Sequence, residues 1–223
     1  MAQVVLMGAG YSVKEGIDQG LWRALRKQNV WSINYAYQAM PFTPSAEVWQ
    51  DLSFWVENQN SLHDLYKQGC CLYARGHDDY RNLKEITCFE PTPRPDEFYG
   101  RDAIAKGKIF TGGMGLTGVF ALSLAVAKKY DTIYLLGYDF GSSSLRDTKT
   151  HFYQDRGINP GASGHPSIYM YDDKPRDEVS DFNRFLDVMQ EDGLEIYNVS
   201  PKSNISSFPK IGYEEFFRRL SHG

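Results

Sequence analysis

The 223-residue sequence lacks the long apolar segments and basic leader that would direct a chain into or across a membrane. No run approaches the roughly 20 apolar residues that a membrane-spanning helix requires. The first residues, MAQVVLMGAG, carry no basic segment and read directly as a strand, which is not typical of a signal peptide. The sequence therefore predicts no membrane span and no secretory signal.

Cysteine is scarce: the chain has three, Cys70, Cys71 and Cys88. Their odd number and clustering do not make a disulfide framework, and they form no CxxC or Cys/His spacing. HExxH is also absent, so no residue pattern indicates a zinc site. Cysteines of this kind usually serve as small buried hydrophobic side chains. We expect a reduced, cytoplasmic chain with no structural metal.

An excess of positive charge is missing as well, because 24 Lys and Arg face 28 Asp and Glu, a net charge of −4. General attraction to nucleic acid or to an anionic membrane surface is therefore not expected, although a local basic pocket is compatible with this balance. Hydrophobic residues make up 42% of the chain, which excludes a disordered protein. The length suits one domain over residues 1–223. A homo-oligomer is left open.

Apolar runs that alternate with helical periodicity predict an α/β protein, a Rossmann-like three-layer sandwich with a mostly parallel central sheet. Strands are expected at 3–7, 30–33, 46–49, 70–74, 133–137 and 194–199. Helices are expected at 16–28 and 54–66, from Thr117 to about 127, and at 176–190 and 213–220. The polar regions 76–108 and 141–174 have no clear period. We expect them to form loop or lid excursions over a site.

A glycine-rich turn, Gly8-Ala9-Gly10-Tyr11-Ser12, directly follows the first predicted strand. Glycines let the backbone approach a phosphate, and the next helix offers free N–H groups and the positive end of its dipole. Ser12 can cap that helix or bind phosphate or ribose. A dinucleotide fingerprint would need glycine where Val13 stands and an acid where Asn34 stands. The turn therefore argues against NAD and leaves two alternatives, a phosphate-binding turn and a tight turn without a ligand.

Asn34 and Asp51 each come directly after a predicted strand. An asparagine side chain can donate to and accept from a base edge, and an aspartate can bind ribose hydroxyls or a metal such as Mg²⁺. Either residue can equally be a helix N-cap or a turn residue. If they are functional, they lie at the carboxyl ends of parallel strands, the edge where open α/β sheets bind ligands.

Residues 111–140 combine a glycine-rich turn, an apolar helix beginning near Thr117-Gly118, and a buried-type strand that ends in Tyr138-Asp139. A carboxylate at the tip of the apolar run YLLGYDF rarely serves the core. The order of the elements places Thr117 and Asp139 on the ligand-binding edge of the sheet. Both are predicted ligand contacts, with Gly118 and Tyr138 beside them.

Two histidines, His151 and His165, lie in the polar region 141–174. Histidine is the natural general acid or base near neutral pH, but a solvated loop histidine is the common alternative. Four basic residues of the same region can meet a phosphate or remain solvated: Lys149, Arg156, Lys174 and Arg176.

Three blocks of the chain resemble the bacterial lipooligosaccharide sialyltransferases of glycosyltransferase family 42. TGVFALSLAVAKKYDTIYLLGYDF, residues 117–140, resembles without a gap their Ser/Thr-Gly, apolar helix, break and IYLxGxDF segment. VVLMGAGYSVKEGID resembles their opening IxxGNGPSLKEID, and LEIYNVSPKSNISSF at 194–208 resembles their late strand and Cys/Ser-Pro-x-Ser turn. The same signatures mark a wider group with a DUF115 domain, which includes motility accessory factors and archaeal 6-hydroxymethylpterin diphosphokinases.

The resemblance implies a nucleotide-dependent transferase that holds a nucleotide, CMP-sugar in the sialyltransferases, at the carboxyl ends of the strands. It implies that the nucleotide is lined by Gly8, Gly10, Ser12 and Asn34. It also implies that Thr117 and Gly118 meet phosphate or the sugar carboxylate, and that Asp139 lies near ribose or base. A nucleotide-sugar glycosyltransferase with an unidentified acceptor is the leading hypothesis.

Two departures from the family pattern matter. Ala9 stands where the family turn has asparagine, so one polar contact is missing. The family's histidine base, just before the late helix, has no counterpart in residues 171–174 (YDDK). His165, His151 or Asp173 would then deprotonate the acceptor hydroxyl. The alternatives are a Mg²⁺-dependent diphosphokinase that uses Asp51, Asp139 and Asp172, and a binding protein for a nucleotide or nucleotide sugar without catalysis.

Overall fold

The computed structural model describes residues 1–112, 115–139, 151–158 and 178–222. Within these residues, eight strands form one sheet in the order β6-β5-β4-β3-β2-β1-β7-β8. All of the pairings between them are parallel. The strands are β1 Gln3–Met7, β2 Val30–Ile33, β3 Ala46–Trp49, β4 Cys71–Arg75, β5 Ile86–Thr92, β6 Lys108–Phe110, β7 Thr132–Leu136 and β8 Glu195–Asn198.

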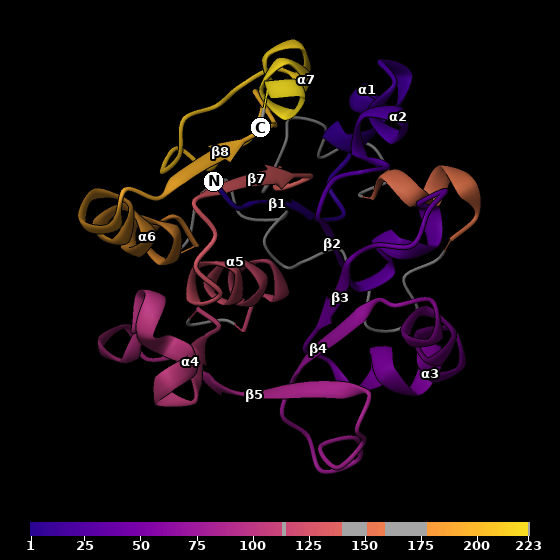
Figure 1. The fold of residues 1–223 in the computed structure, drawn as a ribbon, viewed down its shortest axis with the longest axis vertical. Helices are drawn as coiled ribbons and strands as arrows, with labels where there is room; N and C mark the ends of the chain where they lie inside the picture. Colours follow the sequence, from indigo (N-terminus) through magenta and orange to yellow (C-terminus); the bar gives the residue numbers. More distant parts are fainter. Residues whose placement is uncertain (113–114, 140–150, 159–177, 223) are drawn as a thin grey trace.

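Helices cover both faces of the sheet, as Figure 1 shows. One face carries α4 Ala103–Lys106, α5 Thr117–Ala127 and α6 Glu178–Asp192. The other carries α1 Ser12–Asp18, α2 Leu21–Leu25, α3 Leu52–Lys67 and α7 Tyr213–His222. Four 3₁₀ segments complete the described elements: η1 Asn34–Ala39, η2 Pro95–Glu97, η3 Gly100–Asp102 and η4 Phe152–Arg156. The predicted Rossmann-like three-layer architecture is confirmed.

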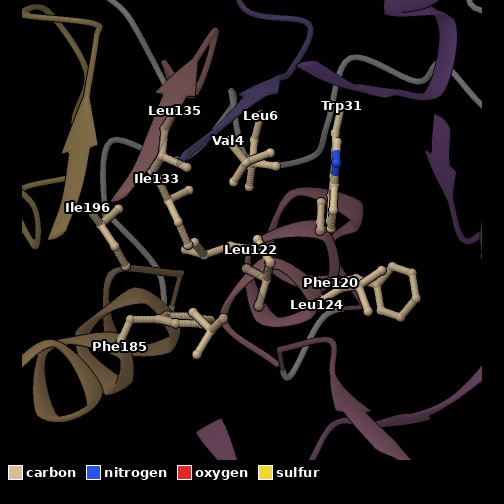
Figure 2. Packing of buried hydrophobic residues seen from close by; sticks show 14 of the residues in the cluster. Val4, Leu6, Trp31, Phe120, Leu122, Leu124, Ile133, Leu135, Phe185 and Ile196 are labelled. Atoms are coloured by element: carbon tan, nitrogen blue, oxygen red, sulfur yellow. The ribbon is translucent and has the colours of Figure 1, made fainter. Parts of the chain in front are cut away.

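The central strands and α5 are apolar because both of their sides are covered. All five residues of β7 are buried, which is typical of a parallel strand between two helical layers. From Val119 to Ala127 every residue of α5 is buried as well. Figure 2 shows its Leu122 and Phe120 beneath the side chains of the strands, with Phe185 of α6 beside them. Each such large side chain contributes roughly 1.5–3 kcal/mol on burial.

The order of the strands creates a topological switch point between β1 and β7. The chain moves outward from β1 through β2 to β6, and then returns to pair β7 with the free side of β1. Connections therefore leave the carboxyl ends of β1 and β7 in opposite directions. Ligands of open α/β sheets bind at such a switch point.

Two sequence predictions need correction. The single helix expected over 16–28 is two short helices, α1 and α2, because Gly20 adopts a left-handed φ of 93° between them. The region 76–108 was expected to be an excursion, but it contributes β5, α4 and the start of β6 to the fold. β5 pairs with β4 through residues 86–89 and with β6 through residues 90–92. Each half of β5 therefore has a paired strand on one side only. A strand that is open on one side can contain Pro91 and exposed residues.

The second expected excursion, 141–174, falls mostly outside the described residues, which include only 151–158 of it. In the part of the chain that is described, no helix has the length and apolar character needed to cross a bilayer.

Candidate functional site at the carboxyl ends of the strands

The turns after β1 and β7 pack directly against each other at the switch point. The Gly8 N–H donates to the Leu136 carbonyl at 2.8 Å, and the Gly10 N–H donates to the Gly137 carbonyl at 2.9 Å. A Cβ on Gly10 would lie 2.5 Å from the Gly137 oxygen. Gly137 itself has a φ of 68°, which favours glycine. The glycines predicted to approach a phosphate are thus on the expected edge, where the contact between the two turns requires them.

Asp139 connects these turns to α1. Its carboxylate is 6% exposed and accepts hydrogen bonds from the Ser12 N–H at 2.8 Å, the Ser12 hydroxyl at 2.5 Å and the Ser200 hydroxyl at 2.6 Å. The side chain thereby caps the first turn of α1 from a neighbouring strand and places a negative charge at the positive end of that helix. Its predicted contact with ribose or base stays a prediction, while its role in holding the Ser12 turn is direct.

The segment that follows β8 forms hydrogen bonds with the same turns. The Ser203 hydroxyl donates to the Tyr138 carbonyl at 2.6 Å, and the Asn204 N–H donates to the Asp139 carbonyl at 3.1 Å. Further along, the Tyr213 hydroxyl donates to the Ser12 carbonyl at 2.9 Å. Three segments that are distant in the sequence therefore form one structural unit at the switch point.

Tyr138 and Gly118 are also in contact. The buried Tyr138 hydroxyl donates to the Gly118 carbonyl at 3.1 Å, and a Cβ on Gly118 would lie 3.1 Å from the ring. Burial raises the pKa of this phenol well above its usual value, so it stays neutral. The Tyr138 side chain acts as a spacer that positions the start of α5 relative to β7.

The start of α5 is a candidate anion site. Thr117 and Gly118 are partly exposed there, and the N-cap residue, Leu116, makes no side-chain capping hydrogen bond. First-turn N–H groups and the dipole of this 11-residue helix favour a negative ligand group at that end.

Gln50, which sequence reasoning missed, lies beside this helix start. It is 5% exposed, and its Nε2 donates to the Gly115 carbonyl at 2.8 Å. Its Oε1 is buried and has no hydrogen-bond partner among the described residues. A buried amide oxygen without a partner is costly, which makes it a natural acceptor for a ligand donor. The signal that could have found Gln50 is its position directly after β3, where the next residue, Asp51, was predicted as the ligand contact.

Asn34 and Asp51 follow the two neighbouring strands, as predicted. Asn34 has a φ of 53°, unusual for a residue other than glycine, and its Oδ1 is buried without a partner in the described structure. Asp51 is the N-cap residue of α3, one of the alternatives considered, but its side chain makes no capping hydrogen bond. Partial burial raises the pKa of Asp51, and the nearby Arg75 lowers it. Both residues lie at the predicted edge of the sheet.

His151 is the candidate base that the described residues include. The N–H of the next residue, Phe152, donates to the Ala9 carbonyl at 3.1 Å, so this segment is hydrogen-bonded to the glycine turn. The imidazole stacks on Tyr153, with ring centroids 5.2 Å apart. Burial lowers the pKa of His151, so the neutral form dominates near pH 7, and its side chain accepts a hydrogen bond from the backbone N–H of Gln154 in a capping box. His165 and Asp173, the other candidates, lie outside the described residues, as do Asp172, Lys149, Lys174 and Arg176.

The remaining predicted cation, Arg156, is engaged elsewhere. Its guanidinium donates to the Ala39 carbonyl at 2.7 Å and lies over the Trp22 ring. Across residues 1–112, 115–139, 151–158 and 178–222, no cluster of three or more His, Cys, Asp or Glu side chains has a metal-binding arrangement.

Aromatic side chains extend the same edge beyond Asp51. Trp55, in the first turn of α3, stacks on Trp49 with an interplanar angle of 10°. Its ring centroid lies 5.6 Å from that of Tyr80. His77, just after β4, lies 5.8 Å from the Tyr80 ring and is 43% exposed at its side chain. Flat, partly exposed rings of this kind can stack on a sugar.

The chain matches no protein-family model, and no curated protein matches it by sequence. Solved structures share its fold. The sialyltransferase CST-II in complex with a trisaccharide acceptor and CMP aligns with a TM-score of 0.53 and 17% identity, over 94% of this chain and 86% of that one. The α-2,3-sialyltransferase from Campylobacter jejuni in apo form aligns with a TM-score of 0.52 and 18% identity, over 96% and 81%. The fold is thus that of these sialyltransferases.

Proposed function

We propose that this chain is a nucleotide-dependent transferase, most specifically a glycosyltransferase that binds a nucleotide-sugar donor at the carboxyl edge of β1, β2, β3 and β7. The observation that carries the proposal is the position of Asn34 and Gln50. Their buried amide oxygens, which have no hydrogen-bond partner among the described residues, lie at the ends of the neighbouring strands β2 and β3, and Gln50 lies beside the start of α5. Ligand hydroxyl or amino groups would satisfy both oxygens.

In this proposal the start of α5 receives the negative charge of the donor. First-turn N–H groups and the Thr117 hydroxyl would stabilise the charge that develops on the departing nucleotide phosphate. The start of α1 is unsuited to that task, because the Asp139 carboxylate already accepts the Ser12 N–H there. The glycine turn would then contribute shape, with its backbone against the ligand, rather than the main electrostatic contact.

The acceptor would approach from the side of β3 and β4. Trp55 and His77 offer partly exposed rings on which a sugar can stack. His151, held beside Ala9, would accept the proton of the attacking hydroxyl; His165 and Asp173 are the alternative bases. The likeness to a structure with CMP and a trisaccharide acceptor supports this choice of substrates.

A ligand screen followed by a donor-consumption assay tests the proposal. Thermal unfolding is measured with CMP, UMP, GMP and AMP, with the diphosphates UDP and GDP, and with the corresponding nucleotide sugars. A true ligand at about 100 times its dissociation constant stabilises the fold by about 2.7 kcal/mol. Release of nucleotide from one donor, reduced in an Asn34→Ala variant, supports a transferase.

Three other results are informative. Binding of a nucleotide without turnover of any donor would select a non-catalytic binding protein. AMP release from ATP that requires Mg²⁺ and a hydroxymethyl acceptor, and that a chelator abolishes, would select the diphosphokinase. Absence of a thermal shift with every nucleotide and nucleotide sugar would overturn the proposal.

A further inference from the structure

A fully buried carboxylic acid, Glu47, lies in the middle of β3 beneath the candidate site. Its side chain is 0% exposed and faces Ser32, its register partner on β2, whose hydroxyl donates to Glu47 Oε2. Oε1 has no hydrogen-bond partner in the described part of the chain. An isolated buried carboxylate costs several kcal/mol, so burial raises the pKa of Glu47 well above its ordinary value. The neutral form of the side chain is thereby favoured.

Within the described residues, the groups that surround Glu47 give it no ionic partner. Three titratable groups interact electrostatically with Glu47: the phenol of Tyr37 on η1, the phenol of Tyr153 on η4, and the thiol of Cys70 just before β4. Burial raises the pKa of each of these groups, so all three are neutral near pH 7. Stability does not explain an acid here, because an apolar side chain would fill the same space without a desolvation penalty.

What Glu47 does contact is the strand end that carries Asn34. Ser32 lies two residues before Asn34, and the backbone N–H groups of Asn34 and Val48 lie beside the Glu47 carboxyl group, where they favour its charged form. A left-handed backbone at an asparagine costs on the order of 1 kcal/mol and persists only where neighbours impose it. η1, which begins at Asn34, is held on its other side by the Tyr37 hydroxyl, which donates to Asn58 at 3.0 Å.

We propose that Glu47 is a positioning residue for the ligand site, which holds the end of β2 so that Asn34 keeps its left-handed conformation and is presented at the carboxyl edge of the sheet. The ligand part of this inference rests on the proposed function. The conformational part concerns only the turn and can be measured without any ligand.

Substitutions that separate the acid's hydrogen bonding from its packing test the inference. Glu47→Gln keeps an acceptor for Ser32, Glu47→Val removes it, and Ser32→Ala combined with Glu47→Val removes both partners. Thr132→Val, a buried polar residue at the amino end of β7, is the matched control. For each protein, thermal unfolding, amide hydrogen exchange at residues 32–36 and affinity for CMP and the other nucleoside monophosphates are measured.

We expect the double variant to unfold at a temperature at or above that of the wild type, because it removes a buried polar pair. Its amide exchange at Asn34 should nevertheless be faster, and its nucleotide affinity about tenfold weaker, the equivalent of 1.4 kcal/mol. Glu47→Gln should keep the amide exchange at Asn34 and the nucleotide affinity within about threefold of the wild type, well below the roughly tenfold loss expected for the double variant. Thr132→Val should change neither.

A stable double variant with exchange and affinity like those of the wild type would overturn the inference. Failure of the wild type to bind any of these nucleotides would instead count against the proposed function, and amide exchange at Asn34 would then decide the role of Glu47 by itself. If Glu47→Val alone fails to fold, the double variant and Glu47→Gln still give the comparison.

Discussion

The carboxylate of Asp139 and the first turn of α1 are joined by two hydrogen bonds, from the Ser12 N–H and from the Ser12 hydroxyl, across 127 residues of sequence. Ser200 adds a third bond to the same carboxylate. An anion built into the protein therefore occupies the position at which many Rossmann-like proteins bind a ligand phosphate. In this chain, that position is occupied by a side chain of the protein itself and joins β7 to α1.

Asp139→Asn should destabilise the protein by about 1–3 kcal/mol, because an amide group presents N–H donors to partners that are themselves donors. Urea denaturation measures the change. Ser200→Ala, which removes one partner and leaves the charge, is expected to cost about 1 kcal/mol. Equal effects of the two substitutions would show that the carboxylate is not the centre of this network.

Gly10→Ala should destabilise the fold by about 1–3 kcal/mol or more, because its Cβ would lie 2.5 Å from the Gly137 oxygen and 2.6 Å from the Asp139 carboxyl carbon. Gly212→Ala is the control, since a Cβ there meets nothing within 4 Å and its φ is not left-handed. Circular dichroism melting curves of the two variants make the comparison, and similar curves would contradict the close packing of the turns.

Asn34→Gly should leave the free energy of unfolding within about 1 kcal/mol of the wild type, because glycine adopts the left-handed conformation readily. Its nucleotide affinity should fall about tenfold, since the side-chain amide is lost. Lys129→Gly is a control of the same backbone type, with a φ of 64° at the far end of α5. An equal loss of affinity in both variants, measured by calorimetry, would remove Asn34 from the site.

The pH dependence of stability should differ between the wild type and Glu47→Gln. The folded-state pKa of Glu47 is raised above its ordinary value of 4.5, so its favourable contribution is complete below about that pH. The contribution is lost as the pH rises toward the raised folded-state pKa, because the unfolded chain ionises first. Relative to the wild type, Glu47→Gln should therefore gain stability as the pH rises from about 4.5 toward the raised folded-state pKa, and the difference should level off above it. A difference that is constant over this range would mean that Glu47 is not buried as a neutral acid.

His151→Ala should abolish donor-dependent transfer if His151 is the base, with nucleotide affinity retained. The wild-type rate should rise with pH through a pKa below 6.5, because burial lowers the pKa of His151. His63→Ala, at an exposed position on α3, is the control. A variant with the wild-type rate and pH profile would assign the base to His165 or Asp173.

The regular core of this fold was accessible from the sequence because its strands are short, apolar and sharply bounded. Residues 30–33 and 46–49 were predicted with the bounds that β2 and β3 have. β5 was missed because it pairs with a different neighbour along each half, which allows polar residues and Pro91 in a strand. Local periodicity cannot detect a strand whose burial is set by partners distant in the sequence.

The site was predictable to the level of strand ends but not to the level of side-chain contacts. Gly8, Gly10, Ser12 and Asp139 do lie together at the predicted edge of the sheet. The hydrogen bond from the Ser200 hydroxyl to Asp139 depends on how separate segments of the chain pack. So does the burial of Gln50 Oε1, which has no hydrogen-bond partner in the described structure. A strand pattern places Gln50 and Asp51 on opposite faces of the sheet, but it does not say which face the ligand uses.

The hydrogen bond from the Tyr213 hydroxyl to the Ser12 carbonyl spans 201 residues, almost the whole chain. Its partner α7 ends at His222, so the first turn of α1 acquires this support only when the last helix is present. During synthesis this hydrogen bond can form only after Tyr213 has left the ribosome. Contacts of such long range slow folding, because a large loop has to close before they form. The turn that joins β1 to α1 should therefore be completed later than the pairing of β2, β3 and β4.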